Sequence, residues 1–162
     1  MSRPAKSRKS DEKRRMRSAS RLYAVQALFQ MEQSGQSVDR VASEFVDHRF
    51  GLAQEDDAEA LVEGDVDLFR EITEEAVNWQ AKIDQMTDRG LVAKWPIARI
   101  DPTLRALFRA AGAELVSTDT PPKVVITEYV DVARAFFPEG KEPKFVNAVL
   151  DHMAREAKPE AF

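Results

Sequence analysis

Apolar residues recur at every third or fourth position along most of this chain of 162 residues, and this spacing constrains the fold more than any other feature. Val66, Phe69, Ile72 and Ala76 show the pattern clearly. Such spacing places the side chains on one face of an α-helix. The alternation with a period of two that a half-buried β-strand requires does not extend over any useful length. The chain is therefore predicted to be all-α.

Capping and breaking residues divide this pattern into six or seven helices. Gly35 is predicted to end the first helix. The pair Asp101-Pro102 is predicted to begin another, because a carboxylate can cap a helix whose first residue is proline. The long pattern over 66–86 is predicted to break near Asn78. Helices of these lengths favour two packed helical subdomains.

The predicted domain organisation is a short arm followed by one helical domain. Residues 1–12 are basic and polar and are expected to be disordered. Residues 13–162 are expected to form a single domain, with an N-terminal subdomain at about 13–64 and a C-terminal subdomain at about 65–158. The acidic stretch 52–65 is predicted to be a linker or a weakly helical segment.

Charge is distributed very unevenly along the chain. Residues 1–21 hold nine basic and two acidic side chains, a net charge of +7, whereas the rest of the chain carries −11. A basic segment on an acidic body is typical of proteins that bind polyanions, because neutralised phosphates release condensed counterions. The alternative is a solvated tail that only improves solubility. Because the basic run continues into a predicted helix, the pattern favours nucleic-acid binding.

The residue patterns of common catalytic and metal sites are missing together. No cysteine is present, which excludes disulfides, thiolate zinc sites and cysteine nucleophiles. His48 and His152 lack partners at metal-ligand spacing. The adjacent carboxylates Glu74 and Glu75 point to different faces of a helix, so they are poorly placed for acid–base catalysis. With no glycine-rich phosphate loop either, we predict no catalytic site, no metal site and no cofactor.

The sequence also predicts the compartment. No stretch reaches the roughly 18 to 20 apolar residues that span a bilayer, and no apolar signal-peptide core follows the basic N-terminus. We expect a cytoplasmic protein without membrane contact.

The basic first helix contains the candidate RNA-binding residues. Arg14, Arg17 and Arg21 are spaced three and four apart and line one face. Gln26 and Phe29 follow about one and two turns later, where an amide could read a base edge and a ring could stack on a base. An equally good interpretation places Phe29 in the hydrophobic core.

Three segments resemble signatures of the NusB family of transcription antitermination factors. Residues 21–30 read RLYAVQALFQ, and the family's first helix has arginines followed by a similar run. Residues 122–130 read PKVVITEYV and are similar to the family's Pro-x-Lys-Val-x-Ile-Asn-Glu segment. Residues 144–151 read KFVNAVLD, close to the C-terminal KFVNGVLD. The three occur in the family's order over roughly 130 residues.

The resemblance implies a fold, a ligand and partners. It implies a seven-helix fold with two subdomains that binds the boxA element of ribosomal RNA leader transcripts, which is single-stranded. It also implies a partner, NusE, a ribosomal small-subunit protein that doubles as a transcription factor. Together they would join the RNA polymerase antitermination complex and suppress premature termination.

The family's RNA contacts are carried over to matching positions of this chain. The arginine-rich contact falls on Arg14, Arg15, Arg17 and Arg21, and the aromatic contact on Phe29. A second RNA-contacting element falls on Lys144 and Phe145. The chain departs from the family at 18–20, where Ser-Ala-Ser separates arginines that are consecutive in many relatives.

Two alternative functions remain open at this point. The same fold serves as the RNA-binding front module of a ribosomal RNA cytosine methyltransferase, although 162 residues leave no room for its cofactor-binding domain. The chain could also be a protein-interaction module whose basic tail is incidental. RNA binding that ignores sequence and disappears in ordinary salt would favour the latter.

Overall fold

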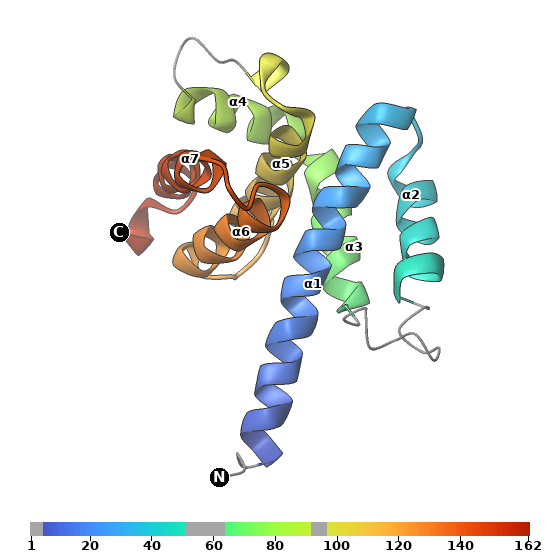
Figure 1. The fold of residues 1–162 in the computed structure, drawn as a ribbon. Helices are drawn as coiled ribbons and strands as arrows, with labels where there is room; N and C mark the ends of the chain where they lie inside the picture. Colours follow the sequence, from blue (N-terminus) through green and yellow to red (C-terminus); the bar gives the residue numbers. More distant parts are fainter. Residues whose placement is uncertain (1–4, 51–63, 92–96) are drawn as a thin grey trace.

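The computed structural model describes residues 5–50, 64–91 and 97–162, and every regular element in these ranges is helical (Figure 1). The predicted all-α fold is confirmed. The seven α-helices are α1 (Ala5–Ser34), α2 (Val38–Phe45), α3 (Val66–Asn78), α4 (Gln80–Gly90), α5 (Pro102–Ser117), α6 (Pro122–Phe136) and α7 (Glu142–Ala157). Short helical turns at Val46–Phe50, Ile97–Arg99 and Pro159–Ala161 complete the described chain.

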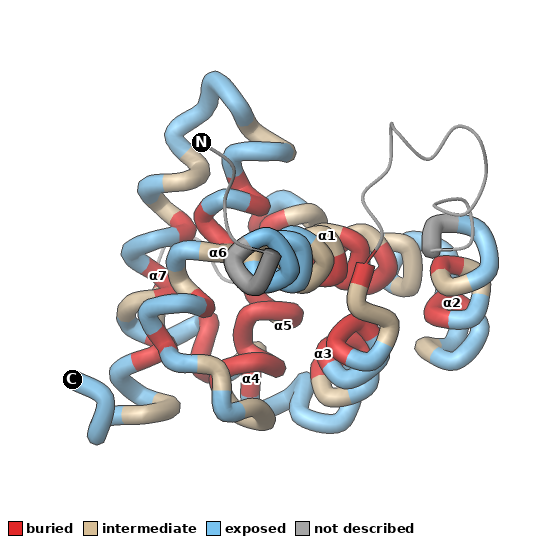
Figure 2. Tube along the Cα trace, turned by 90° about the horizontal axis from the view of Figure 1, so that it is seen from below, coloured by how far each residue is buried: buried red, intermediate tan, exposed pale blue. Residues whose placement is uncertain are grey.

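Helix α1 is the central element of the fold. It packs against α2 and α3 on one side and against α5 and α6 on the other (Figures 1 and 2). Helices α4 to α7 pack closely on one another, and α3 contacts both α1 and α5. Because α3 belongs to both groups of helices, the subdomain boundary near residue 64 stays a prediction.

The middle of α1 is buried on more than one face because helices cover it from both sides. Val25 and Leu28 are buried, as the apolar pattern predicted, but Tyr23, Ala24 and Ala27 are buried as well. The core continues through α5, where Leu107, Phe108, Ala111 and Leu115 are fully covered. A helix that is apolar nearly all round is the expected result of burial between two layers.

The prediction of a disordered arm is wrong for residues 5–12, because α1 already begins at Ala5. Alanine, lysine, arginine and glutamate are good helix formers, and neither glycine nor proline occurs between residues 5 and 34. Extending a helix is easier than nucleating one, so the packed C-terminal half of α1 supports the basic turns before it. These turns project beyond the other helices (Figure 1). Residues 1–4 lie outside the described residues.

Local signals set the helix ends where the sequence indicated. The Asp101 carboxylate accepts a hydrogen bond from the Thr103 amide at 2.7 Å, with Pro102 in the first turn of α5. Gly35 follows α1 with a φ of +72°, a conformation that favours glycine. The predicted interruption near Asn78 is confirmed, since α3 and α4 meet at Trp79. Most of the predicted linker, 52–65, lies outside the described residues, but Asp65 caps α3 through the Leu68 amide at 3.0 Å.

Candidate nucleic-acid interface

The arginines of α1 occupy different environments along the helix. Arg14 and Arg15 are exposed, and neither forms an ion pair with another described residue. Arg17 is partly covered, with 34% of its side chain exposed, and its guanidinium lies 3.7 Å from the Asp65 carboxylate. These three side chains keep donors available to an anion, as the phosphate-contact prediction requires.

Arg21 is buried, and the prediction that it contacts phosphate is wrong. Only 2% of the residue is exposed. Its Nε and Nη2 donate to the two oxygens of the Glu114 carboxylate at 2.6 and 3.2 Å, and Nη1 lies 3.4 Å from Glu128. A guanidinium with two carboxylate partners in the interior is a structural ion pair, because separating it would leave Glu114 charged and uncompensated.

The hydroxyl of Tyr129 completes this buried network. It donates to Glu114 Oε1 at 2.9 Å. Burial raises the pKa of Tyr129 well above 10, and the nearby Glu114 charge raises it further, so the hydroxyl stays a neutral donor. Burial alone would lower the pKa of Arg21, but the hydrogen bond and charge of Glu114 raise it above its ordinary value. Arg21 therefore stays charged.

Sequence reasoning missed Glu114 and Tyr129 as partners of Arg21. A signal for them does exist in the sequence of α5. Glu114 stands among buried residues, between Ala113 and Leu115, and a carboxylate in such a segment needs a cationic partner. The partner itself could not be read from the chain, since 93 residues separate Arg21 from Glu114.

The two serines between Arg17 and Arg21 attach α1 to its neighbours. Ser18 Oγ donates to Glu128 of α6 at 2.8 Å, and Ser20 Oγ donates to the Asp65 carbonyl oxygen at 2.6 Å. The departure from the family pattern at 18–20 therefore falls on a stretch of α1 that is committed to contacts within the protein.

Phe29 lies at the surface of α1. The residue is 37% exposed, so its full burial in the core, one of the two predictions, is wrong. Gln26 is half-buried, and its side-chain Oε1 accepts no hydrogen bond from any described residue. The exposed ring of Phe29 remains compatible with RNA contact, whereas Oε1 of Gln26 is buried and leaves only the Nε2 amino group as a possible contact.

The second predicted RNA element, at the start of α7, has two different side chains. Lys144 is exposed. Phe145 is half-buried, and its ring packs edge-on against Phe108 with 6.1 Å between ring centroids. Phe145 thereby anchors α7 to α5. If the contacts carried over to Phe29, Lys144 and Arg21 belonged to one RNA site, the three side chains would have to share a surface. Arg21 is buried and therefore cannot be part of such a surface.

Arginines near the other end of α1 are already paired. The guanidinium of Arg105 forms an ion pair with Glu32, and Arg109 lies 3.0 Å from both Glu32 and Asp84. The hydrogen bond from Arg105 lowers the pKa of Glu32, so this carboxylate stays ionised near neutral pH. Both arginines belong to α5 and are already paired, so they add no free cation at this end of α1.

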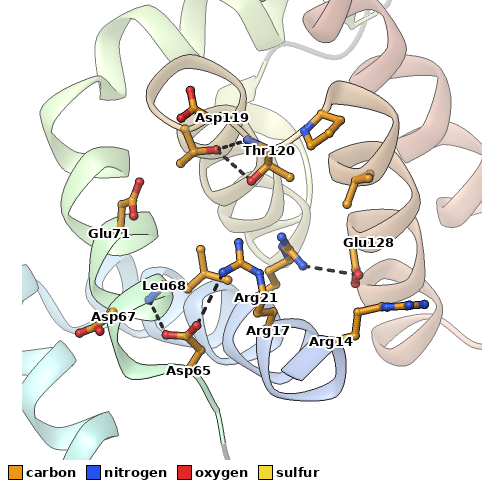
Figure 3. A pocket seen from close by; sticks show the side chains of 13 residues that line it. Arg14, Arg17, Arg21, Asp65, Asp67, Leu68, Glu71, Asp119, Thr120 and Glu128 are labelled. Atoms are coloured by element: carbon orange, nitrogen blue, oxygen red, sulfur yellow. Dashed lines mark hydrogen bonds and ion pairs between the residues drawn. The ribbon is translucent and has the colours of Figure 1, made fainter. Parts of the chain in front are cut away.

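A cleft of about 630 Å³ opens beside Arg14, Arg17 and Arg21 of α1 (Figure 3). Its walls come from α1, the first turns of α3, the turn between α5 and α6, and α6 itself. Five carboxylates and three guanidiniums line it, so its net charge is negative although α1 is basic. The carboxylates belong to Asp65, Asp67, Glu71, Asp119 and Glu128.

Among the described residues, no three histidine or carboxylate side chains gather where they could hold a metal ion. No helix in the described ranges is both long enough and apolar enough to cross a bilayer.

Comparisons with known proteins give a consistent result. The profile of the NusB family matches residues 18–155. The chain is 45% identical over 163 residues to the transcription antitermination protein NusB of Maricaulis maris, with all of both chains covered. It is 46% identical over 152 residues to the NusB protein of Granulibacter bethesdensis, covering 91% of this chain and 93% of the relative.

Solved structures show the same fold. Thermotoga maritima NusB superimposes with a TM-score of 0.69 at 28% identity, covering 90% of this chain and 95% of the other. A crystal structure of antitermination factors NusB and NusE in complex with double-stranded RNA matches with a TM-score of 0.68 at 23% identity, covering 86% and 96%.

Proposed function

Because the chain belongs to the NusB family, we propose that it is a transcription antitermination factor that binds boxA-type single-stranded RNA of ribosomal RNA transcripts together with NusE. In this role it joins the RNA polymerase antitermination complex and supports processive transcription. The observation that carries the proposal is the similarity to NusB proteins at about 45% identity over the whole chain. The basic, unpaired arginines of α1 support an RNA contact.

The proposed phosphate contacts are Arg14, Arg15 and Arg17, with Lys144 as a further cation. All four keep part of their side chain exposed. Phosphate contacts position a protein on RNA without reading its sequence. Arg21 is left out because it is buried, and Phe145 is assigned the support of Lys144 through its packing on Phe108.

Phe29 is the proposed stacking residue. It lies about four turns from Arg14 and Arg15, so it projects from nearly the same side of α1, roughly 22 Å away. Gln26, one turn before it, is the proposed edge contact through its Nε2 amino group, since its Oε1 is buried. Between the two ends that side of α1 is covered, since Val25 is buried and Ser18 bonds to α6. An RNA strand that contacts both ends must therefore pass over the neighbouring helices.

The proposed mode of action is binding without catalysis, in the cytoplasm where bacterial transcription takes place. Membership of a family of transcription factors supports both parts. The relatives matched over their full length are antitermination proteins, which favours this function over a methyltransferase module.

The test is binding of a boxA-containing RNA against a scrambled RNA of equal length, with and without NusE. We expect the boxA RNA to bind more tightly, and NusE to increase the difference. Equal binding of both RNAs that disappears at moderate salt would favour the interaction module with an incidental basic tail.

A further inference from the structure

The cleft beside α1 has a basic floor and acidic walls. Arg17 of α1 lies along its floor next to Arg21, while Glu71 of α3 and Asp119 of the α5–α6 turn stand on the surrounding walls (Figure 3). Leu68 and Val124 add apolar surface. Arg17, Glu71 and Asp119 come from segments that are far apart in the sequence.

Only some of these charges are satisfied within the protein. Arg21 is neutralised by Glu114 and Glu128, and Asp65 both caps α3 and faces Arg17. By contrast, Glu71 and Asp119 are exposed and form no hydrogen bond or ion pair with any described residue. Arg17 has one long ion pair and is 34% exposed. The cleft thus offers free acceptors on its walls and free donors on its floor.

This combination selects the chemistry of a ligand. The net negative charge of the cleft repels an anionic group such as phosphate. A cationic group would be attracted by Glu71 and Asp119, but it would also face the guanidinium of Arg17 on the floor. A neutral, planar group that carries both donors and acceptors meets neither repulsion. Nucleobases are such groups, and carboxylates accept hydrogen bonds from their exocyclic amino groups while guanidinium donates to ring acceptors or stacks on the ring.

We propose that the cleft is a base-reading subsite that takes one unpaired nucleobase bearing an exocyclic amino group, that is, cytosine, adenine or guanine. Glu71 or Asp119 accepts from the amino group, and Arg17 donates to a ring acceptor or stacks on the base. The RNA backbone stays at the edge of the cleft, on Arg14, which lines it, and on the exposed Arg15. This inference rests on the proposed function, and it adds a sequence-reading element to a surface of phosphate contacts.

The test uses the full chain with NusE and a set of boxA-containing RNAs in which each amino-bearing base is replaced singly by uracil. The variant is Glu71→Ala with Asp119→Ala. The control, Glu74→Ala with Glu160→Ala, removes the same charge at exposed positions outside the cleft. Since all four side chains are exposed, we expect both variants to keep the thermal midpoint of the wild type.

For the wild type, we expect at least one replacement by uracil to weaken binding about tenfold, the size of a good base-edge contact. The double cleft variant should lose that penalty, and the control should retain it. If the cleft variant keeps every wild-type penalty, or binds all RNAs more tightly by one common factor, its carboxylates read no base and the inference is overturned.

Failure of the proposed function gives a different result. It shows as a wild-type protein that binds boxA and scrambled RNA equally, and it overturns base reading as well. A wild-type preference for boxA that survives in the cleft variant overturns the subsite alone.

Discussion

The two halves of α1 use the same residue type for opposite purposes. In the N-terminal half, Arg14 and Arg15 project into solvent from turns that extend beyond the other helices. Seven residues after Arg14, Arg21 is enclosed by α5 and α6 and bonded to Glu114. The helix is continuous and its pattern of arginines is regular. What differs is the packing around it, so the neighbours of an arginine decide whether it binds a ligand or holds the fold together.

The largest expected effect is on stability, from replacing the enclosed arginine. Arg21→Ala leaves Glu114 buried without its cation, which should cost about 3 to 5 kcal/mol of unfolding free energy. Arg14→Ala, the matched change in the exposed half, should stay within about 0.5 kcal/mol of the wild type. Urea denaturation measures both. Similar losses for the two variants would show that the halves do not differ as described.

Phe29 tests whether the surface end of the C-terminal half takes part in binding. If its ring stacks on a base, Phe29→Ala should lose about 1 to 3 kcal/mol of RNA-binding free energy, measured by titration with labelled boxA RNA. Its effect on stability should be well below that of Phe108→Ala, which empties a core position and should cost about 3 to 5 kcal/mol. A folded Phe29→Ala protein with wild-type affinity would exclude Phe29 from the interface.

The buried network around Arg21, in the C-terminal half of α1, should make the stability of the protein depend on pH in the alkaline range. The pKa of Tyr129 is raised in the folded state. As pH rises, its hydroxyl therefore ionises in the unfolded chain, near pH 10, before it ionises in the folded protein. Its contribution to stability is therefore complete below pH 10 and is lost as pH rises further, by up to about 1.4 kcal/mol per pH unit. Unfolding free energy measured at pH 9 and pH 11 should fall less steeply for Tyr129→Phe than for the wild type. Parallel losses in the two proteins would contradict this assignment.

Substitutions in the exposed N-terminal half of α1 should change the salt dependence of RNA binding and leave the unfolding free energy nearly unaffected. Arg14→Ala and Arg15→Ala should each remove one phosphate contact, which reduces the slope of log affinity against log salt by about 0.7. Arg40→Ala, at an exposed arginine of α2 paired with Glu44, is the control and should keep the wild-type slope. An unchanged slope for Arg14→Ala would place that arginine away from the RNA backbone.

Much of the fold follows from local signals that the sequence carries openly. Apolar spacing, the Asp101-Pro102 start, Gly35 and the interruption near Asn78 all act within a few residues, so they predicted the helices correctly. What failed depended on distant contacts. The burial of Arg21 depends on Glu114 in another helix, and helical periodicity cannot show that helices enclose α1 from two sides.

The candidate site divides in the same way. The basic run and the exposed Arg14 and Arg15 were predictable from composition and spacing. The cleft was not, because Arg17, Glu71 and Asp119 come from three separate segments and adjoin only after folding. Charge counting also misled at Arg21, since it treats every basic side chain as available to a ligand.

The distance along the chain between α1 and its carboxylate partners determines when, during protein synthesis, these bonds can first form. Arg21 bonds to a residue 93 positions later, and Ser18 to one 110 positions later. Ribosomes add roughly 5 to 20 residues per second, so the first helix waits on the order of 5 to 20 s before its partners have even been made. During that interval Arg21 is one more free cation on a nascent chain. The number of arginines that face outward is therefore settled only when translation nears its end.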